Sequence, residues 1–283
     1  MRVVCAGHVN WDVTMRVDSL PAPDAESVVE SRRESGGGSA ANVAVALSDL
    51  GVTASLLGSV GTDERGERVR RELTAAGVEV DPVQAVEGRT AVKYLLVDGD
   101  GEVAVVDDGG VNEAFRVEAV PEALFEDAAA CHLTGQRPET AARLAERASE
   151  AGLPVSFDPG RRLGGRDYTA TLERCDVLFL NSREADQLPA VPGDTLVVRK
   201  HGADGATLEG PGLAFEHPGF GAGCVDTSGA GDAFAAGFLD AWLREAGSGR
   251  ALATANACGA LAAATPGSRP DLDPERVREL VDG

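Results

Sequence analysis

The feature that most constrains the fold is a repeated alternation between short apolar runs and longer segments with helical spacing. The first run covers residues 2–6 and ends at Gly7; similar runs recur at residues 53–60, 130–134, 155–158, 177–180 and 196–199. Several runs are apolar at every position, as strands are when both faces of their sheet are covered. We therefore expect an α/β fold with three layers, α/β/α, around a mostly parallel central sheet.

Segments with helical spacing fill the intervals between these runs. We expect helices at residues 40–50, 64–76, 139–151, 230–244, 251–264 and 274–281. Gly51 and Gly77 follow the first two of them, in the position where glycine commonly ends a helix. Parallel strands need crossover connections, and these helices can supply them.

Two stretches break the alternation and predict a second, smaller sheet. Residues 13–35 and 89–110 alternate polar and apolar side chains, as antiparallel strands with one wet face do, and residues 98–101 (Asp-Gly-Asp-Gly) predict a hairpin turn. We expect these stretches to form a β lid over a cleft. The main domain would then consist of residues 1–12, 36–88 and 111–283, and the lid would exclude water from a reactive group.

The charge of the chain limits its partners. Its 283 residues include 46 acidic and 26 basic ones, which gives a net charge of −20, and Lys93 and Lys200 are its only lysines. Such a surface repels nucleic acid and anionic membranes, so we expect neither as a partner. The acidic residues are scattered along the chain and lysine is rare, which favours a protein adapted to a salt-rich cytoplasm, where salt screens the repulsion between its charges. An ordinary acidic protein from a GC-rich genome is the alternative. With no signal peptide and no apolar span of about twenty residues, we expect a soluble cytoplasmic protein.

The most informative motif lies at residues 226–238. Gly229, Ala230 and Gly231 precede a segment with the apolar spacing of a helix. A glycine turn that opens onto a helix leaves backbone N–H groups unpaired and points the positive end of the helix dipole outward, which makes an anion site. Asp232 lies at the edge of this site and could take a proton from a hydroxyl, although the dipole alone also favours an acid there. An anion site beside a carboxylate fits the transfer of a phosphoryl group to an alcohol.

Over essentially its full length the chain resembles the PfkB/ribokinase family of carbohydrate and nucleoside kinases, as a haloarchaeal-type member. Two motifs carry the resemblance: residues 7–12 (Gly-His-Val-Asn-Trp-Asp) followed by residues 36–42 (Gly-Gly-Gly-Ser-Ala-Ala-Asn), and residues 226–232. Smaller pieces also fit in order and spacing, at residues 58–63, 158–159, 181–184 and 200–205. The resemblance implies a ribokinase-like fold and an ATP-dependent kinase.

The resemblance also implies roles for residues at the phosphate-donor end. Asp232 would be the catalytic base, and Gly229, Ala230 and Gly231 would form the anion hole. Asn181 and Glu184 match a motif that organises Mg²⁺ and its waters near the nucleotide, although they also make a good start of a helix. The other residues that the resemblance assigns to the nucleotide are Lys200, Gly202, Gly205 and Asn256. Those that match the K⁺ site of potassium-activated members are Asp226, Ser228 and Gly267.

At the acceptor end, Asn10 and Asp12 match residues that grip substrate hydroxyls. The adjacent wall would consist of Gly37, Gly38 and Asn42. Where ribokinases place a substrate-binding glutamate, this chain has Gln136 and Arg137, and Arg162 matches an arginine of keto-deoxy-sugar-acid kinases. Losing an acid and gaining an arginine favours an acceptor with negative charge, although surface salt bridging is the alternative for each arginine.

These departures rank the possible acceptors. A pentose or pentose phosphate comes first, with ribose 1-phosphate or ribose favoured, a nucleoside second, and a 2-keto-3-deoxy sugar acid third. A non-catalytic sensor of sugar or nucleotide is the remote alternative, and the intact Asp232 argues against it. Dimers through the lid are common in the family that the chain resembles, so we expect a homodimer.

Overall fold

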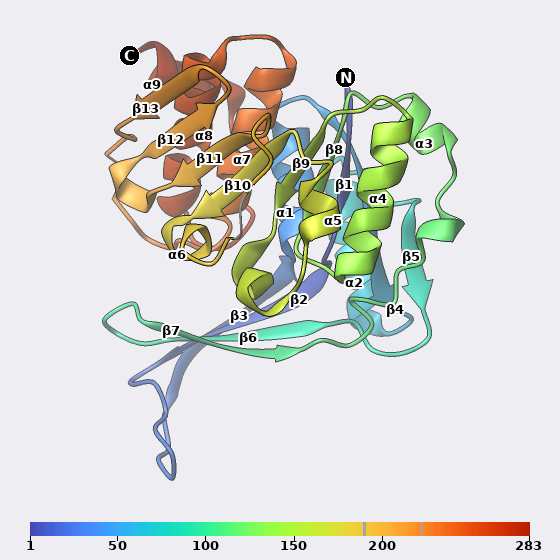
Figure 1. Cartoon of the computed structure of the whole chain (residues 1–283). Helices are drawn as coiled ribbons and strands as arrows, with labels where there is room; N and C mark the ends of the chain where they lie inside the picture. The colour runs from blue at the N-terminus through green and yellow to red at the C-terminus, as the bar shows by residue number, and fades with distance from the viewer. Residues whose placement is uncertain (189–190, 222) are drawn as a thin grey trace.

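The computed structural model of the protein describes residues 1–188, 191–221 and 223–283. These residues form a layered body of helices and strands, and a separate small sheet extends from one edge of that body (Figure 1). The expected α/β/α architecture with a mostly parallel central sheet and a second, smaller sheet is confirmed. In the described part of the chain, no helix is both long enough and apolar enough to cross a bilayer.

The central sheet has the strand order β13-β12-β11-β10-β9-β8-β1-β4-β5. The strands from β11 to β5 pair in parallel, whereas β12 and β13 form an antiparallel edge. The strands are β1 (Arg2–Ala6), β4 (Thr53–Gly61), β5 (Val83–Val86), β8 (Ala130–Thr134), β9 (Val155–Asp158), β10 (Val177–Asn181), β11 (Leu196–Lys200), β12 (Ala206–Gly210) and β13 (Leu213–His217).

Helices cover both faces of this sheet, because successive side chains of a strand point to opposite sides. In β1, Val3 and Cys5 pack into the core on one face, and Val4 and Ala6 pack into the core on the other. The first face carries α1 (Ser39–Asp49), α2 (Glu64–Ala75), α7 (Ala230–Leu243), α8 (Ser248–Ala263) and α9 (Pro274–Asp282). The second carries α3 (Ala123–Glu126), α4 (Pro138–Glu150), α5 (Thr169–Leu172) and α6 (Ser182–Ala185). The 3₁₀ turns are η1 (Val117–Ala119), η2 (Gly160–Gly165) and η3 (Gly202–Asp204).

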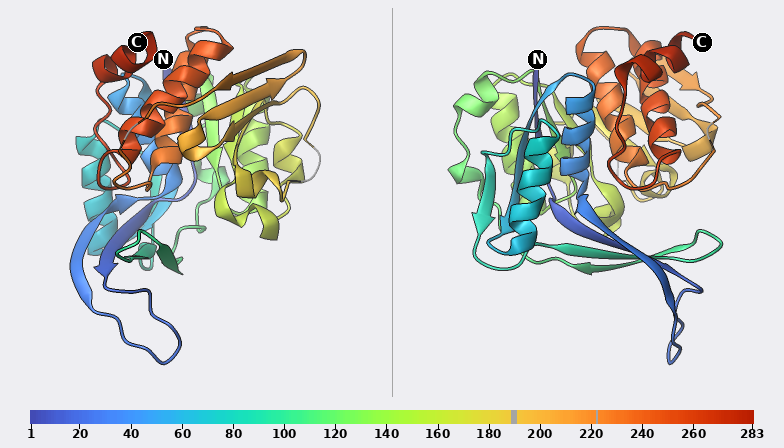
Figure 2. Two further views of the ribbon diagram at one scale, coloured as in Figure 1. Left: turned by 90° about the vertical axis from the view of Figure 1, so that its left-hand side faces the viewer. Right: turned by 180° about the vertical axis from the view of Figure 1, so that it is seen from behind.

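The small sheet has the order β3-β2-β6-β7, formed by β3 (Val29–Gly37), β2 (Asn10–Val17), β6 (Val92–Val97) and β7 (Val103–Asp108). Strand β2 pairs antiparallel with β3 and parallel with β6, and β6 pairs antiparallel with β7. The sheet projects away from the body, as both views in Figure 2 show. Its strands begin and end at the motif residues 10–12 and 36–37, so those residues lie at the junction of the two sheets.

Polar residues lie at the carboxyl ends of neighbouring strands, and three of them belong to motif pieces that the sequence singled out: Asp158, Asn181 and Lys200. Thr134 and Asp158 are register partners at the ends of β8 and β9, and Asn181 and Lys200 are register partners at the ends of β10 and β11. The carboxyl edge of a parallel sheet is where ligands bind in open α/β folds. The chain passes from the same end of β1 directly into the small sheet, so that sheet lies beside this edge.

Candidate active site

Three polar side chains at the junction of the two sheets have buried atoms without partners. Asn10 begins β2 and Gln136 follows β8, and both are buried; Asp12 lies on β2. Within the described residues, the Nδ2 of Asn10, the Oδ1 of Asp12 and the Nε2 of Gln136 make no hydrogen bond. Buried polar atoms without partners are costly, so these atoms fit a polar ligand that would satisfy them.

Asn112 determines which end of the Asn10 amide is available. The Nδ2 of Asn112 donates to the Oδ1 of Asn10, and the Oδ1 of Asn112 accepts from the backbone N–H of Val9 over 3.0 Å. The carbonyl end of Asn10 is therefore occupied, and its NH₂ end is the one left for a ligand oxygen.

Asp12 is packed closely against the glycines of the second motif. A Cβ at Gly37 would lie 2.0 Å from the Oδ2 of Asp12, so only glycine fits there. The next residue, Gly38, precedes α1 with a φ of 98°, a conformation that favours glycine. Burial raises the pKa of Asp12, while the positive charges of Lys93 and Arg269 oppose that rise.

Asp232, in the first turn of α7, is joined to Asn42 of α1 by a hydrogen bond. The Nδ2 of Asn42 donates to the Oδ2 of Asp232 over 2.9 Å, which connects motifs 190 residues apart. Burial raises the pKa of Asp232 to about 6, against the hydrogen bond from Asn42 and the charge of Lys200. A carboxyl group with this pKa is mostly ionised at pH 7 and is a better proton acceptor than an ordinary one.

The turn before α7 has the geometry of an anion site. Gly229 adopts a left-handed φ of 74°, and a Cβ there would lie 2.1 Å from the carbonyl oxygen of Ser268. The turn leads into a helix of 14 residues, whose first N–H groups and dipole attract negative charge. The Nζ of Lys200 lies 3.5 Å from the position that a Cβ on Gly231 would take, so a cation also borders this turn.

Lys200 is paired with Asp158, and Glu184 lies near both. The Nζ of Lys200 is 2.6 Å from the Oδ2 of Asp158. Burial alone would lower the pKa of Lys200, but the carboxylates of Asp158, Glu184 and Asp232 raise it above its usual value. Burial and the charge of Asp158 raise the pKa of Glu184. The group therefore combines a permanently charged ammonium with carboxylates that interact electrostatically with it.

Asn181 and Glu184 form a capping box at the start of α6. The backbone N–H of Asn181 donates to the Oε2 of Glu184 over 2.8 Å, and the backbone N–H of Glu184 donates to the Oδ1 of Asn181 over 3.0 Å. The structural interpretation of this pair is thus present in the molecule. It leaves Glu184 rigidly oriented at the carboxyl end of β10.

The other residues expected at the nucleotide lie around this edge in separate places. Gly202 begins η3 and Gly205 follows it, after β11. Asn256 is buried within α8, and its Nδ2 donates to the carbonyl oxygen of Leu252 over 2.9 Å. Asp226 accepts the backbone N–H groups of Ser228 and Gly267 over 2.9 and 2.8 Å.

The two arginines expected to contact the acceptor, Arg137 and Arg162, meet at Glu113. Their closest approaches to its carboxylate are 3.5 and 3.3 Å, and Arg166 approaches to 2.7 Å. The Nε2 of His8 lies 3.2 Å from the same carboxylate, and Arg162 also pairs with Asp107 of β7. We call these residues the arginine cluster: His8, Glu113, Arg137, Arg162 and Arg166. The bonded groups lower the pKa of Glu113 far below its usual value, so its charge is permanent.

The arginine cluster adjoins the unpartnered atoms described above. Glu113 directly follows Asn112, which holds Asn10, and Arg137 directly follows Gln136. Sequence reasoning missed Asn112, Glu113 and Arg166 as site residues. A second arginine four residues after Arg162 was the single signal for Arg166, and nothing in the local pattern marked the other two.

One family matches both the sequence and the fold. A family model described as pfkB family carbohydrate kinase matches residues 1–275. The ATP-dependent ribose-1-phosphate kinase of Halopiger xanaduensis is 55% identical over 278 residues, which cover 95% of this chain and 94% of that protein. The nucleoside kinase of Methanothermobacter thermautotrophicus is 30% identical over 86% of this chain and 83% of its own length. The crystal structure of the Methanocaldococcus jannaschii nucleoside kinase, an archaeal member of the ribokinase family, superposes with a TM-score of 0.86 over 99% of this chain and 98% of that one, at 23% identity. The expected ribokinase-like fold is confirmed.

Proposed function

Since this chain belongs to the pfkB family of carbohydrate kinases, we propose that it transfers the γ-phosphoryl group of ATP to a hydroxyl of ribose 1-phosphate. It is an ATP-dependent phosphotransferase with an alcohol group as acceptor, as the sequence predicted. The observation that carries the choice of acceptor is the arginine cluster beside Asn10 and Gln136. The 55% identity to a haloarchaeal kinase that acts on ribose 1-phosphate supports the same choice.

The unpartnered atoms give each acceptor residue a role in this proposal. Asn10, Asp12 and Gln136 bind the sugar hydroxyls, because a sugar offers the donors and acceptors that these atoms lack. Gly37, Gly38 and Asn42 form the wall beside them. Asp232 takes the proton from the attacking hydroxyl, through the carboxylate oxygen that Asn42 does not contact.

The arginine cluster binds the phosphate of the acceptor. Three guanidinium groups face the two carboxylates of Glu113 and Asp107, and they carry more N–H donors than those carboxylates can accept. Arginine binds phosphate through paired, charge-assisted hydrogen bonds. Burial lowers the pKa of His8, so the guanidinium groups supply the positive charge at neutral pH.

The donor end fits the phosphates of ATP. The Gly229–Gly231 turn, the first turn of α7 and the buried ammonium of Lys200 together provide N–H donors and positive charge. Because a loose transition state spreads charge over the transferred group, this arrangement serves as the anion hole. We assign Gly202 and Gly205 to the rim of the nucleotide site and Asn256 to the neighbourhood of the base.

Magnesium fits this site only together with the nucleotide. Among the described residues, no group of three His, Cys, Asp or Glu side chains could hold a metal by itself. Magnesium commonly keeps several waters and binds through one or two carboxylates plus substrate phosphates. The buried, capped Glu184 fits such a role through water, with Asn181 orienting it. When bound, Mg²⁺ would neutralise charge on the phosphates.

The Asp226 site fits potassium poorly, because both oxygens of its carboxylate already accept backbone N–H groups and a guanidinium lies beside Gly267. The hydrogen bonds from Ser228 and Gly267, and then the charge of Arg33 beside Gly267, lower the pKa of Asp226 despite burial. Replacing KCl with NaCl at equal ionic strength should therefore change kcat by less than about twofold, since screening depends on ionic strength. A large loss of kcat in NaCl, restored by adding KCl, would place potassium at Asp226.

A panel of acceptors tests the proposed substrate. With ATP and Mg²⁺ in concentrated salt, kcat/KM should be highest for ribose 1-phosphate and about 10³-fold lower for ribose, which lacks the group that the arginines bind. Inosine, cytidine and a 2-keto-3-deoxy sugar acid complete the panel. Turnover of nucleosides with ribose 1-phosphate inert would assign a nucleoside kinase instead, and a preference for the sugar acid would assign the third alternative.

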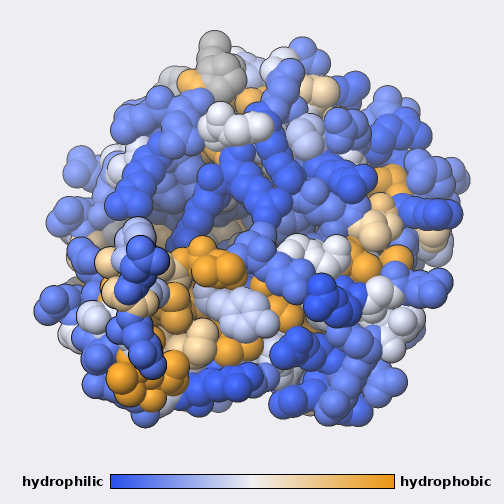
Figure 3. All heavy atoms as spheres, turned by 90° about the horizontal axis from the view of Figure 1, so that it is seen from below, coloured by the Kyte–Doolittle hydropathy of each residue, from blue (hydrophilic) through white to orange (hydrophobic). Residues whose placement is uncertain are grey.

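We propose that residues 13–35 and 89–110 act as a lid on a domain made of residues 1–12, 36–88 and 111–283. The lid exposes several valines: Val28, Val29, Val103, Val105 and Val106. On the face seen from below, where the lid lies, apolar side chains gather among hydrophilic ones (Figure 3). Covering this patch favours a homodimer through the lid.

The net charge of −20 supports adaptation to a salt-rich cytoplasm.

A further inference from the structure

We propose that Arg269 is a positioning residue, which fixes the orientation of the Asn42 amide and thereby the hydrogen bond that Asp232 receives. The inference rests on the role of Asp232 as the base. Arg269 itself contacts neither the base nor the unpartnered atoms of the acceptor end through a hydrogen bond. Its hydrogen bonds reach the base only through Asn42, while its charge also acts on Asp232 directly.

Arg269 lies in the loop before α9 and reaches the start of α1. Its Nε donates to the Oδ1 of Asn42 over 3.0 Å, and its Nη2 donates to the carbonyl oxygen of Gly37 over 3.1 Å. The guanidinium is largely buried, with 13% of the side chain exposed. It therefore holds both the amide of Asn42 and the backbone of the acceptor wall.

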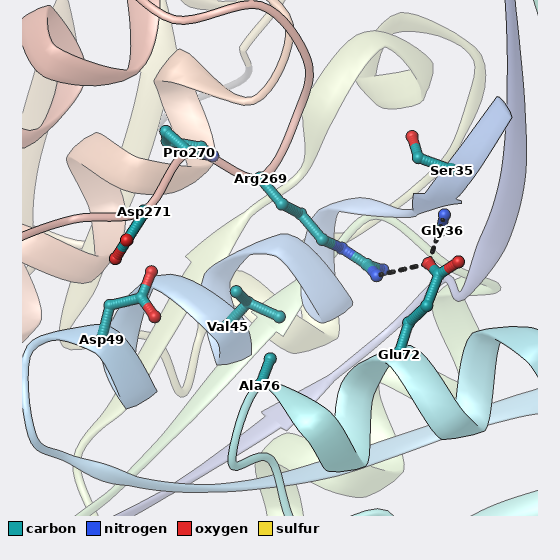
Figure 4. A pocket seen from close by; sticks show the side chains of 9 residues that line it. All are labelled: Ser35, Gly36, Val45, Asp49, Glu72, Ala76, Arg269, Pro270 and Asp271. Carbon is teal, nitrogen blue, oxygen red and sulfur yellow. Dashed lines mark hydrogen bonds and ion pairs between the residues drawn. The ribbon is translucent and has the colours of Figure 1, made fainter. Parts of the chain in front are cut away.

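Glu72 of α2 anchors the arginine from the other side. The Oε2 of Glu72 lies 3.8 Å from the Nη1 of Arg269 and accepts the backbone N–H of Gly36 over 2.8 Å (Figure 4). A cavity of about 300 Å³ lies beside this pair, bordered also by Val45 and Ala76 (Figure 4). On that side the arginine is held by its polar contacts and not by close packing.

The chemistry of the two side chains makes the arrangement directional. A side-chain amide can be turned end for end, which exchanges its donor and its acceptor. Arginine has donors only, so it requires the Oδ1 of Asn42 to face it, and the Nδ2 must then face Asp232. With the amide reversed, its oxygen would face the carboxylate and repel it. Arg269 thus ensures that the base receives a donor.

The charged surroundings of Asp232 predict the consequence of losing this donor. Besides the bond from Asn42, the groups that act on the carboxyl are Asp158, which raises its pKa, and Lys200, Lys93 and Arg269, which favour the charged form. Burial raises the pKa of Asp232, and the hydrogen bond from Asn42 offsets part of that rise. If Asn42 is no longer oriented, this offset is lost and the pKa of Asp232 rises above about 6. More of the base is then protonated in the acid range.

A double-mutant cycle tests the inference through the pH profile of kcat. Arg269→Met should move the acid limb upward by about one pH unit, which lowers kcat about fivefold at pH 6 and less than twofold at pH 8. In an Asn42→Ala background, the same replacement should move the limb by less than half as much, because the intermediary is gone. Arg250→Met is the matched control: Arg250 pairs with Asp282 at 2.8 Å on an exposed surface, and its loss should leave the limb in place.

Two results would overturn the inference. Equal shifts in both backgrounds would mean that Arg269 acts by its charge alone, and an unmoved limb with a lowered Tm would mean that it only anchors the loop. Arg269→Gln covers the case of an unfolded Met variant: its neutral amide can donate or accept, so it no longer requires the Oδ1 of Asn42 to face it, and the limb should again move upward. No shift in this variant would also reject the inference. If the Asp232→Asn enzyme is active, Asp232 is not the base. If it is inactive and the effects of the Arg269 and Asn42 replacements are additive, only the role of Arg269 is rejected.

Discussion

Replacing Asp232 with asparagine is expected to lower kcat by about 10³-fold while leaving the affinity for ATP nearly unchanged. Asparagine has the same shape and keeps an oxygen for the bond from Asn42, but it cannot take a proton from the acceptor hydroxyl. The proposed anion site consists of backbone N–H groups and Lys200, which the substitution does not alter. Initial rates and calorimetric titration with the nucleotide measure the two quantities separately.

Asp240→Asn is the matched control for this substitution. Asp240 lies two turns further along α7, where it accepts from Arg244 over 2.7 Å. It is remote from the turn that begins the helix, so kcat should change little. Turnover of Asp232→Asn within tenfold of the unmodified enzyme would reject Asp232 as the base, and a lost affinity for ATP would mean that the carboxylate shapes the anion site.

The raised pKa of Asp232 also predicts how the same variant changes stability. Its pKa in the folded protein is about 6 and its ordinary value is 3.8, so the folded state binds the extra proton between these values. Ionised Asp232 therefore costs stability, and the cost is complete above about pH 6. The neutral asparagine removes a cost of about 3 kcal/mol at most. Thermal unfolding should show a higher Tm for the variant at pH 8 and no gain at pH 4.

The central sheet was predictable because its strands are buried on both faces and are therefore apolar throughout. The expected runs coincide closely with β1, β4, β8, β9, β10 and β11. Strands β12 and β13 were not predicted, because they lie at the antiparallel edge, where side chains such as Phe215 are exposed and the apolar pattern is weak. Strand β5 was not predicted because Gln84 interrupts its short apolar run and only Val83 of its four side chains is buried.

The candidate site was predictable only where a motif is local. The turn at Gly229–Asp232 and the pair Asn181 and Glu184 each lie within one short segment, and local geometry constrains such segments strongly. The bond from Asn42 to Asp232 spans 190 residues, so only the folded chain can place its two partners together. The same holds for Arg269, which lies in a loop with no periodic pattern and reaches Asn42 across 227 residues.

Removing both Arg162 and Arg166 by alanine substitution is expected to lower kcat/KM for ribose 1-phosphate by about 10³-fold, because each charge-assisted bond is worth about 2 kcal/mol. For ribose, the loss should stay below about tenfold, since its hydroxyls are bound by Asn10, Asp12 and Gln136 in the proposed site. The comparison of the two acceptors in one variant removes any general effect on folding or on ATP. Lysine substitutions should give intermediate losses, because lysine keeps the charge but not the paired donors.

Arg143→Ala is the control for a lost surface charge, because Arg143 pairs only with Glu146 on the exposed side of α4 in the described chain. Its kcat/KM for both acceptors should remain unchanged. Equal losses for ribose and ribose 1-phosphate in the double variant would mean that the arginine cluster supports the shape of the site through Glu113 and binds no phosphate. Unchanged values for both would mean that other cations bind the acceptor phosphate, such as Lys93 and Arg269, whose charges act on Asp12. Either outcome would reject the arginine cluster as the determinant of the acceptor.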